Sequence, residues 1–403
     1  MLLRVLTLLL AASAAFAETP AVFAQVDEML AGLSQITGWQ VRRKVPAQVL
    51  KKETFRRYVD SHIKDAAGDK ELQAQEIVLK MFGMVPPDFN LARESADLVT
   101  EQAAAFYDYT KRRLFLLDST SDNAEQRMAL VHELAHALAD QQYPLGKYMR
   151  QGGKSDKGDD DAATARQAVV EGQASWLSWA YLSMRAGGRA EVPQRMLEQL
   201  SQVGAEGAEF PVFTQAPLYI RESLVFPYSE GLRFQDAVYR QRGREAFDEV
   251  FRHAPQSTHE ILHPAAFLSG AAQQTVEAPA LDPARDFRTR IEGSLGEFDF
   301  SALLRQYIDP RLGADTASHW TGGAYRLYQH KHDKYNVLAY RAVFDSPEAA
   351  RNYFTLYRQV LGKKWKKLDI DASSEAQLTG KGDTGRFVLR LNGAAVESIE
   401  GLH

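Results

Sequence analysis

The segment 128–142, MALVHELAHALADQQ, constrains the fold more than any other part of the sequence. At 3.6 residues per turn, His132 and His136 lie one turn apart on the same side of a helix. The other faces of that helix carry mostly aliphatic side chains, so we expect it to be buried nearly all round. Two imidazoles and the Glu133 carboxylate cost several kcal/mol in such surroundings unless a partner satisfies them, so the fold has to supply that partner.

A zinc ion is the partner that this spacing favours. Zn2+ takes imidazole nitrogens as ligands at about 2.0–2.1 Å, and His132 and His136 can both reach one ion. Glu133 then lies beside the metal without binding it, where it can take a proton from the water that the metal activates. We therefore expect one zinc ion per chain, with Glu133 as general base. The alternative is an apolar helix that carries two His by coincidence.

The third ligand has to come from another part of the chain, because catalytic zinc takes three protein ligands and keeps one position open. The segment ARQAVVEGQASWLSWA places Glu171 within a second apolar helix, directly before Gly172. A glycine allows two helices to pack closely, and the polar loop at 146–161 lets this helix return towards the first. We expect Glu171 to be the third ligand; a solvent-facing helical Glu is the alternative.

The segments that carry these residues resemble a known family. HELAH followed by EG is similar to the gluzincin group of zinc metallopeptidases, in which two His and one Glu hold the metal. More closely, AFYDYTKRRLFLLD, HELAHALADQQ, ARQAVVEGQA and PQSTHEILHP together resemble a little-characterised group of exported bacterial HExxH proteins. The likeness covers most of residues 38–290 and fades towards the C-terminus. It implies a zincin-like fold with His132, His136 and Glu171 as ligands and Glu133 as general base.

Two departures from the gluzincin pattern concern the surroundings of the metal. The spacing to Glu171 is longer than in the best-known gluzincins, and Ser175 stands where many of them have an Asp that orients a ligand His. Such outer partners are worth about 10–100-fold in metal affinity or activity. Asp140, one turn beyond His136, is the candidate replacement. Solvation at the C-terminal end of the helix is the other expectation for Asp140.

A hydrogen-bond donor for the reacting carbonyl oxygen is also expected, because hydrolysis builds negative charge there. In FPYSEGLRFQDAVY, Tyr228 stands three residues before Gly231, which resembles the Tyr-x-x-Gly helix of gluzincin aminopeptidases, whose Tyr is that donor. An ordinary half-buried aromatic residue is the alternative. His263 in EILHP is the second candidate, whereas His259 and His253 are expected at the surface.

Substrate binding is expected at a sheet edge. The segment 103–117 has the pattern of a β-hairpin, with strands at 103–107 and 113–117 around a turn. Zincins bind extended substrate by adding it to an edge strand beside the zinc, and 113–117 is the natural candidate. If both strands are fully paired, substrate selection comes from loops instead.

The chain as a whole reads as α+β. The expected elements before residue 296 are a strand within 40–50, helices from Glu53 to Pro86, the hairpin, helices at 123–142, 161–184 and 222–252, and a closing loop at 255–264. Asp122 and Glu125 have the spacing of a capping box for the first long helix. Paired strands at 324–344, a helix at 346–361 and a hairpin at 385–401 follow. We expect an N-terminal segment at 18–37, a zincin-like catalytic domain at 38–295 and a C-terminal α+β module at 296–403.

The first residues resemble an export signal: Arg4 precedes an apolar run at 5–15, and Ala-Phe-Ala at 15–17 is a cleavage site. We expect a signal peptide at 1–17, export to the periplasm or the medium, and no stable membrane insertion after cleavage. The chain has no Cys, which excludes disulfides and thiol chemistry. Its formal net charge of −4 gives no reason to expect nucleic acid as a partner.

Together these features predict an exported zinc metallopeptidase that acts on peptide or protein substrates. An envelope binding or assembly protein that keeps zinc for structural reasons is the competing prediction, and a zinc hydrolase of cell-wall amide bonds is a third. A blocked fourth zinc position and an unchanged Glu133→Gln variant would favour the structural protein.

Overall fold

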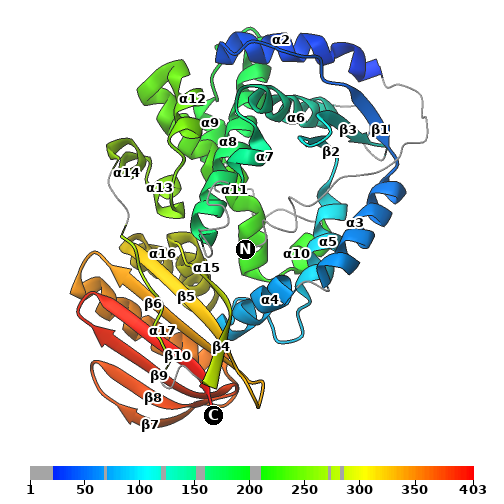
Figure 1. The fold of residues 1–403 in the computed structure, drawn as a ribbon. Coiled ribbons are helices and arrows are strands. Elements are labelled where there is room, and N and C mark those ends of the chain that lie inside the picture. Colours follow the sequence, from blue (N-terminus) through cyan, green and yellow to red (C-terminus); the bar gives the residue numbers. More distant parts are fainter. Residues whose placement is uncertain are drawn as a thin grey trace.

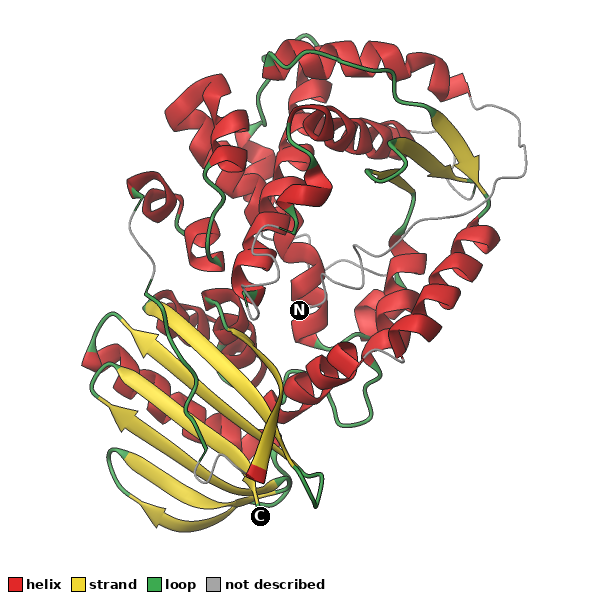
Figure 2. Cartoon of the chain, viewed as in Figure 1, coloured by secondary structure: helices red, strands yellow, loops and turns green. Residues whose placement is uncertain are grey.

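The computed structural model describes residues 21–67, 70–118, 124–150, 159–199, 210–270, 274–281 and 286–403. The expected signal peptide at 1–17 and the expected helix cap at Asp122 lie outside these residues. Within them the chain has the expected α+β class. A helix-rich part carries a small sheet, and a C-terminal module is built on one large sheet (Figure 1, Figure 2). None of the described helices combines the length and apolarity needed to cross a bilayer.

The helix-rich part begins with a helix that the sequence analysis did not predict. The short 3-10 helix η1 (Ala21–Gln25) leads into α2 (Val26–Thr37), whose Met29, Leu30 and Leu33 are buried in the main core. The following elements are β1 (Ala47–Leu50), α3 (Lys52–Ala67), α4 (Lys70–Phe82), α5 (Leu91–Gln102), β2 (Ala105–Asp108) and β3 (Arg113–Leu117). Helix α5 was also not predicted; Asn90 caps it by accepting the Arg93 N–H at 2.9 Å.

The small sheet has the strand order β1-β3-β2, with β1 parallel and β2 antiparallel to β3. Strand β3, at 113–117, is therefore central and paired on both sides. The prediction that this strand forms the substrate edge is wrong, because β1 comes from a distant part of the chain and takes that side. The edges of the sheet are β1 and β2, and β2 packs against the helix that carries His132.

Three long helices form the centre of the helix-rich part (Figure 1). They are α6 (Ala124–Gln142), α8 (Asp160–Arg185) and α11 (Leu218–Arg242), and α8 packs against both of the others. Shorter helices complete this part: α7 (Leu145–Tyr148), α9 (Gln194–Gln199), α10 (Pro211–Gln215), η3 (Gly243–Glu245), α12 (Ala246–Arg252), α13 (Thr258–Leu262) and α14 (Pro264–Ser269). The segment 255–264, expected as a loop, thus holds α13.

The C-terminal module is a seven-stranded antiparallel sheet with the strand order β4-β5-β6-β10-β9-β8-β7. Its strands are β4 (Phe287–Ser294), β5 (Trp320–His330), β6 (Asn336–Phe344), β7 (Asp369–Ser373), β8 (Gln377–Gly382), β9 (Gly385–Asn392) and β10 (Ala395–Leu402). Helices α15 (Glu297–Tyr307), α16 (Pro310–Ser318) and α17 (Pro347–Lys364) belong to the same module. The sheet begins with β4, so the module starts before the boundary expected at residue 296.

Buried polar contacts join the module to α4. Lys364 and Glu400 form an ion pair at 2.6 Å, with each side chain 1 % exposed. The Lys364 Nζ also donates to the Met81 carbonyl oxygen at 3.0 Å, and the Tyr307 hydroxyl donates to the Gly83 carbonyl oxygen at 2.6 Å. These contacts involve the end of α4, where Gly83 has a φ of 80° that favours glycine.

Candidate metal centre

Three predicted ligands converge on one point between α6 and α8. The Nε2 atoms of His132 and His136 lie 3.1 Å apart. The Oε2 atom of Glu171 lies 3.1 Å from the first and 3.3 Å from the second. A tetrahedral zinc ion with bonds of about 2.0–2.1 Å holds its ligand atoms about 3.3 Å apart. The two imidazoles and the carboxylate therefore fit one zinc ion as a set of three ligands.

Local sequence brings Glu171 to this point through a close crossing of α8 and α11. A Cβ added to Gly172 would lie 2.0 Å from the Gly231 carbonyl carbon, and one added to Gly231 would lie 2.1 Å from the Ala168 carbonyl oxygen. Only glycine at both positions allows the backbones to approach so closely. Because Gly172 follows Glu171 and Gly231 lies one turn after Tyr228, the crossing also sets where those two side chains meet.

Glu133 lies beside the two His and is held by the small sheet. One carboxylate oxygen of Glu133 and the ring nitrogens of His132 and His136 lie within 4.8 Å of one another. The Oε2 atom of Glu133 accepts the Tyr107 backbone N–H at 2.7 Å. Burial raises the pKa of Glu133 to about 7, and the charge of His132 opposes that rise. The carboxylate expected to be the base is thus fixed next to the ligands.

The pKa of Glu171 is shifted in the opposite direction from that of Glu133. Burial favours its neutral form, but the charge of His136 and hydrogen bonds from both imidazoles lower the pKa well below its usual range. Glu171 is therefore anionic in this site, while His132 and His136 approach the same point from α6 with side chains only 15 % and 10 % exposed.

Asp140 holds Tyr107 and does not bond to His132 or His136. Its Oδ2 atom accepts the Tyr107 hydroxyl and the Arg43 guanidinium, each at 3.0 Å, and its Oδ1 atom accepts the Leu145 N–H at 3.0 Å. With 7 % of its side chain exposed, it is not solvated either. Asp140 therefore matches neither expectation, because it does not orient a His and is not exposed to solvent. Its link to Glu133 through Tyr107 joins residues distant in sequence and could not be read from helix spacing.

Tyr228 lies at the site, as predicted. Its ring centroid is 5.9 Å from that of His132, with an angle of 30° between the rings. Although 45 % of the residue is exposed, burial around its hydroxyl and the carboxylates of Glu171 and Glu133 raise its pKa well above the usual value. The Tyr228 hydroxyl is thus a neutral donor close to the Glu171 and Glu133 carboxylates.

His263 lies in a different cluster. Its Nε2 atom is 3.0 Å from the Glu297 Oε2 atom, and the His259 Nδ1 atom is 2.5 Å from the same oxygen. His253 is at the surface as expected, with 72 % of its side chain exposed, but only 28 % of the His259 side chain is exposed. The sequence HEILH at 259–263 is itself an HExxH pattern. The sequence analysis missed it because it treated 255–264 as a loop.

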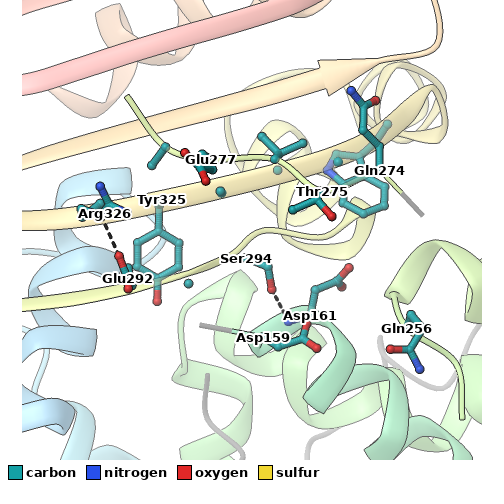
Figure 3. Close-up of a pocket in the computed structure, with 17 residues that line it drawn as sticks. Asp159, Asp161, Gln256, Gln274, Thr275, Glu277, Glu292, Ser294, Tyr325 and Arg326 are labelled. Atoms are coloured by element: carbon teal, nitrogen blue, oxygen red, sulfur yellow. Dashed lines mark hydrogen bonds and ion pairs between the residues drawn. The ribbon is translucent and has the colours of Figure 1, made fainter. Parts of the chain in front are cut away.

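A cavity of about 500 Å³ lies away from the His132 cluster, where the start of α8 meets β4 and β5 (Figure 3). Its lining includes Asp159 and Asp161 from α8 and its cap. Ser294 of β4 accepts the Asp161 N–H at 2.9 Å, and Glu292 pairs with Arg326 across the strands. The cavity therefore belongs to the junction between the two parts of the chain.

Comparison with protein families matches one part of the chain. A family model described as a domain of unknown function (DUF8575) matches residues 286–402, from just before β4 to the end of β10. Comparison with curated proteins and with solved structures finds no match. The family match supports the C-terminal module as a unit that begins at β4.

Proposed function

We propose that this protein is an exported, zinc-dependent hydrolase of peptide bonds with a zincin-like catalytic domain. The observation that carries the proposal is the convergence of His132, His136 and Glu171 at 3.1–3.3 Å, with Glu133 beside them. Two His and one carboxylate form a ligand set typical of catalytic zinc, which keeps a fourth position open. When bound, zinc would polarise a carbonyl group and lower the pKa of a water molecule.

Glu133 would act as general base and then as acid. Because the Tyr107 N–H fixes its Oε2 atom, the other carboxylate oxygen is left for proton transfer. Tyr107 in turn is held by Asp140, so the base is positioned by a chain of hydrogen bonds that leads to Arg43. General acid–base catalysis of this kind contributes about 10²–10⁴-fold to the rate.

Tyr228 would stabilise the negative charge that develops on the carbonyl oxygen. Its hydroxyl stays protonated, because burial and the nearby carboxylates raise its pKa, and its ring lies beside His132. Removing one such donor costs about 10²–10³-fold in kcat.

Substrate would bind along the outer edge of β2. The Leu117 N–H donates to the Ala104 carbonyl oxygen, and antiparallel pairing alternates, so the polar backbone groups of Ala105 and Tyr107 face away from β3. Tyr107 uses its N–H for Glu133. Ala105 is then the position where an extended peptide would add to the sheet next to the base.

The test is hydrolysis of a mixed peptide library by the mature protein and by Glu133→Gln, with zinc content measured for both. We expect cleavage by the unmodified protein and a loss of about 10²–10⁴-fold in the variant, at unchanged zinc content. Glu260→Gln is the matched control, because it alters the Glu of the other HExxH segment and should keep full activity. Equal activity of the Glu133→Gln and unmodified proteins would contradict the proposal. Zinc in both without cleavage would favour the envelope binding protein.

A further inference from the structure

We propose that His259, His263 and Glu297 form a second zinc site, which fastens the C-terminal module to the helix-rich part. One ligand atom from each residue lies within 4.8 Å of the others. The His259 Nδ1 atom is 2.5 Å and the His263 Nε2 atom 3.0 Å from the Glu297 Oε2 atom. The proposal concerns a site separate from the catalytic one and does not depend on hydrolysis.

The kind of ion follows from the donors. Two imidazole nitrogens suit zinc and related transition metals, whereas calcium and magnesium prefer sites built from oxygen atoms alone. The Glu297 carboxylate supplies the negative charge and is 6 % exposed, while 40 % of the His263 side chain is exposed. The site is thus anchored on a buried carboxylate and open to solvent on the imidazole side, where an ion can enter and bind water.

The backbone around the three residues holds them together. The Thr258 N–H, directly before His259, donates to the buried Asp161 Oδ1 atom at 3.0 Å. A Cβ added to Gly296, directly before Glu297, would lie 1.8 Å from that same oxygen and 2.3 Å from the Thr258 hydroxyl. Glycine at 296 therefore allows α15 to begin in contact with α13 and α8, and this contact brings Glu297 under the two imidazoles.

The second cluster is too far from the first to share its chemistry. Asp161 contacts the second cluster through Thr258, and Glu171 belongs to the first. Both residues lie on α8, ten residues apart, which corresponds to about 15 Å along the helix. Metal ions that act together on one substrate lie about 3.5–4 Å apart. The two clusters therefore define two separate metal sites.

The second site also has no base in the position of Glu133. The corresponding residue, Glu260, turns back to the start of its own helix, where its Oε2 atom accepts the Gln256 N–H at 2.5 Å. Ser257 caps the same helix by accepting the Glu260 N–H. The second site therefore has a structural role, because the carboxylate that would move protons is bonded to the backbone just before α13.

The location of the site defines what it stabilises. His259 and His263 lie at the end of the helix-rich part, and Glu297 begins α15 of the module, so α13 and α15 meet at the junction (Figure 1). The chain has no Cys and hence no disulfide to fasten the two parts. A metal ion that binds only the folded arrangement adds its binding free energy to the stability of that arrangement.

The experiment counts zinc ions bound to the full mature chain. The protein is stripped with a chelator, titrated with Zn2+ alone and analysed by native mass spectrometry. We expect about two zinc ions in the unmodified protein, about one in Glu297→Gln, about one in Glu171→Ala and none in the double variant. Zinc should also raise the Tm of Glu171→Ala but not that of the double variant. Far-UV circular dichroism confirms folding of each variant.

His263→Gln provides a second route if Glu297→Gln does not fold, because the amide can still hydrogen-bond to Glu297. The matched control is His253→Gln, which alters an exposed His beside Glu249 and should leave the zinc count unchanged. A single zinc ion in the unmodified protein that is lost in Glu171→Ala would overturn the second site while leaving the hydrolase proposal intact. Two zinc ions in both Glu297→Gln and His263→Gln would overturn it as well.

Discussion

The chain contains the same short pattern, H-E-x-x-H, in two places with different outcomes. In the 19-residue helix α6, His132 and His136 both present Nε2 to one point, and Glu171 arrives from α8. In the second segment, the five-residue helix α13 ends just before His263, and the Nδ1 atom of His259 and the Nε2 atom of His263 approach Glu297. The pattern places two imidazoles together in both cases, but the third residue comes from a different part of the fold.

The middle Glu separates the two clusters chemically. Glu133 lies beside its imidazoles and accepts the Tyr107 N–H of β2. Glu260 instead accepts the Gln256 N–H at the start of its own helix. Gln256 precedes the Ser257 cap of α13, so Glu260 is bonded to the chain just before its own helix, whereas Glu133 is bonded to a strand. The backbone N–H that each Glu accepts therefore decides where its carboxylate is held.

The largest effect expected beyond Glu133 is at Tyr228. Changing Tyr228 to Phe removes the donor but keeps the ring beside His132, so kcat should fall about 10²–10³-fold with little change in KM and zinc content. Steady-state kinetics on a cleaved peptide measures this. Tyr239→Phe, on the same helix, is the control and should retain activity. A fall in zinc content together with activity would show that Tyr228 supports the ligands and does not stabilise the transition state.

A change at the crossing of α8 and α11 should weaken zinc binding at the first cluster and leave the second cluster unchanged. Changing Gly172 to Ala puts a Cβ 2.0 Å from the Gly231 carbonyl carbon, so the helices must move apart at a cost of about 1–3 kcal/mol. Denaturation should show this loss, and zinc titration should show weaker binding at the first site with the second unchanged. In Gly362→Ala of α17 the nearest atom would be 3.8 Å away, so no loss is expected. Equal stability of both variants would contradict the inference that α8 and α11 are too close for a Cβ at position 172.

Glu260 should contribute to stability and not to catalysis. Changing Glu260 to Ala removes the hydrogen bond to the Gln256 N–H, which is worth about 0.5–1.5 kcal/mol in free energy of unfolding. Urea denaturation measures that loss, while peptide hydrolysis and zinc number should stay at their unmodified values. A large loss of hydrolysis in this variant would mean that the second HExxH segment takes part in catalysis.

The smallest effect concerns an imidazole–carboxylate pair at the surface, His319 and Asp345. His319 Nδ1 lies 2.7 Å from Asp345 Oδ2 at the surface. The hydrogen bond to Asp345 raises the pKa of His319 above 6.5, with smaller effects from Asp315 and Glu297. Since the folded pKa is the higher one, the pair stabilises the fold below about pH 6.5, and this contribution is lost as pH rises through the folded pKa.

Both members of this pair are nearly half exposed, so solvent reduces its contribution to a few tenths of a kcal/mol. Changing His319 to Gln should lower the free energy of unfolding by that amount at about pH 5.5 and have no effect at about pH 8.5. Denaturation curves at the two pH values measure the difference. An effect that is equal at both would show that His319 acts through packing and not through charge.

Sequence patterns predicted much of the first cluster because its information is local. The spacing of His132, Glu133 and His136 follows from helix geometry alone. Glu171 and Tyr228 were also placed near the ligands, each identified by a neighbouring glycine, and the structure brings both there. The helices α6, α8 and α17 and the strands of the hairpins match their predicted positions within a few residues, and the helices expected over 222–252 are α11, η3 and α12.

Other features depended on contacts between distant segments. The pairing of β1 with β3 makes β2 the edge strand, and no periodicity within 113–117 could indicate that. The partners of Asp140 include Arg43 and Tyr107, which lie far from it in sequence. Helices α2 and α5 went unpredicted, although α2 supplies several residues of the main core.

The sequence alone determined which side chains share a helical face, because the α-helical repeat relates positions only a few residues apart. This places two imidazoles side by side in both HExxH segments. Tertiary structure decided which carboxylate joins each pair, Glu171 across a glycine crossing and Glu297 across the junction of the two parts. The physical reason is that a third ligand depends on packing between separate elements, and packing is a property of the whole fold.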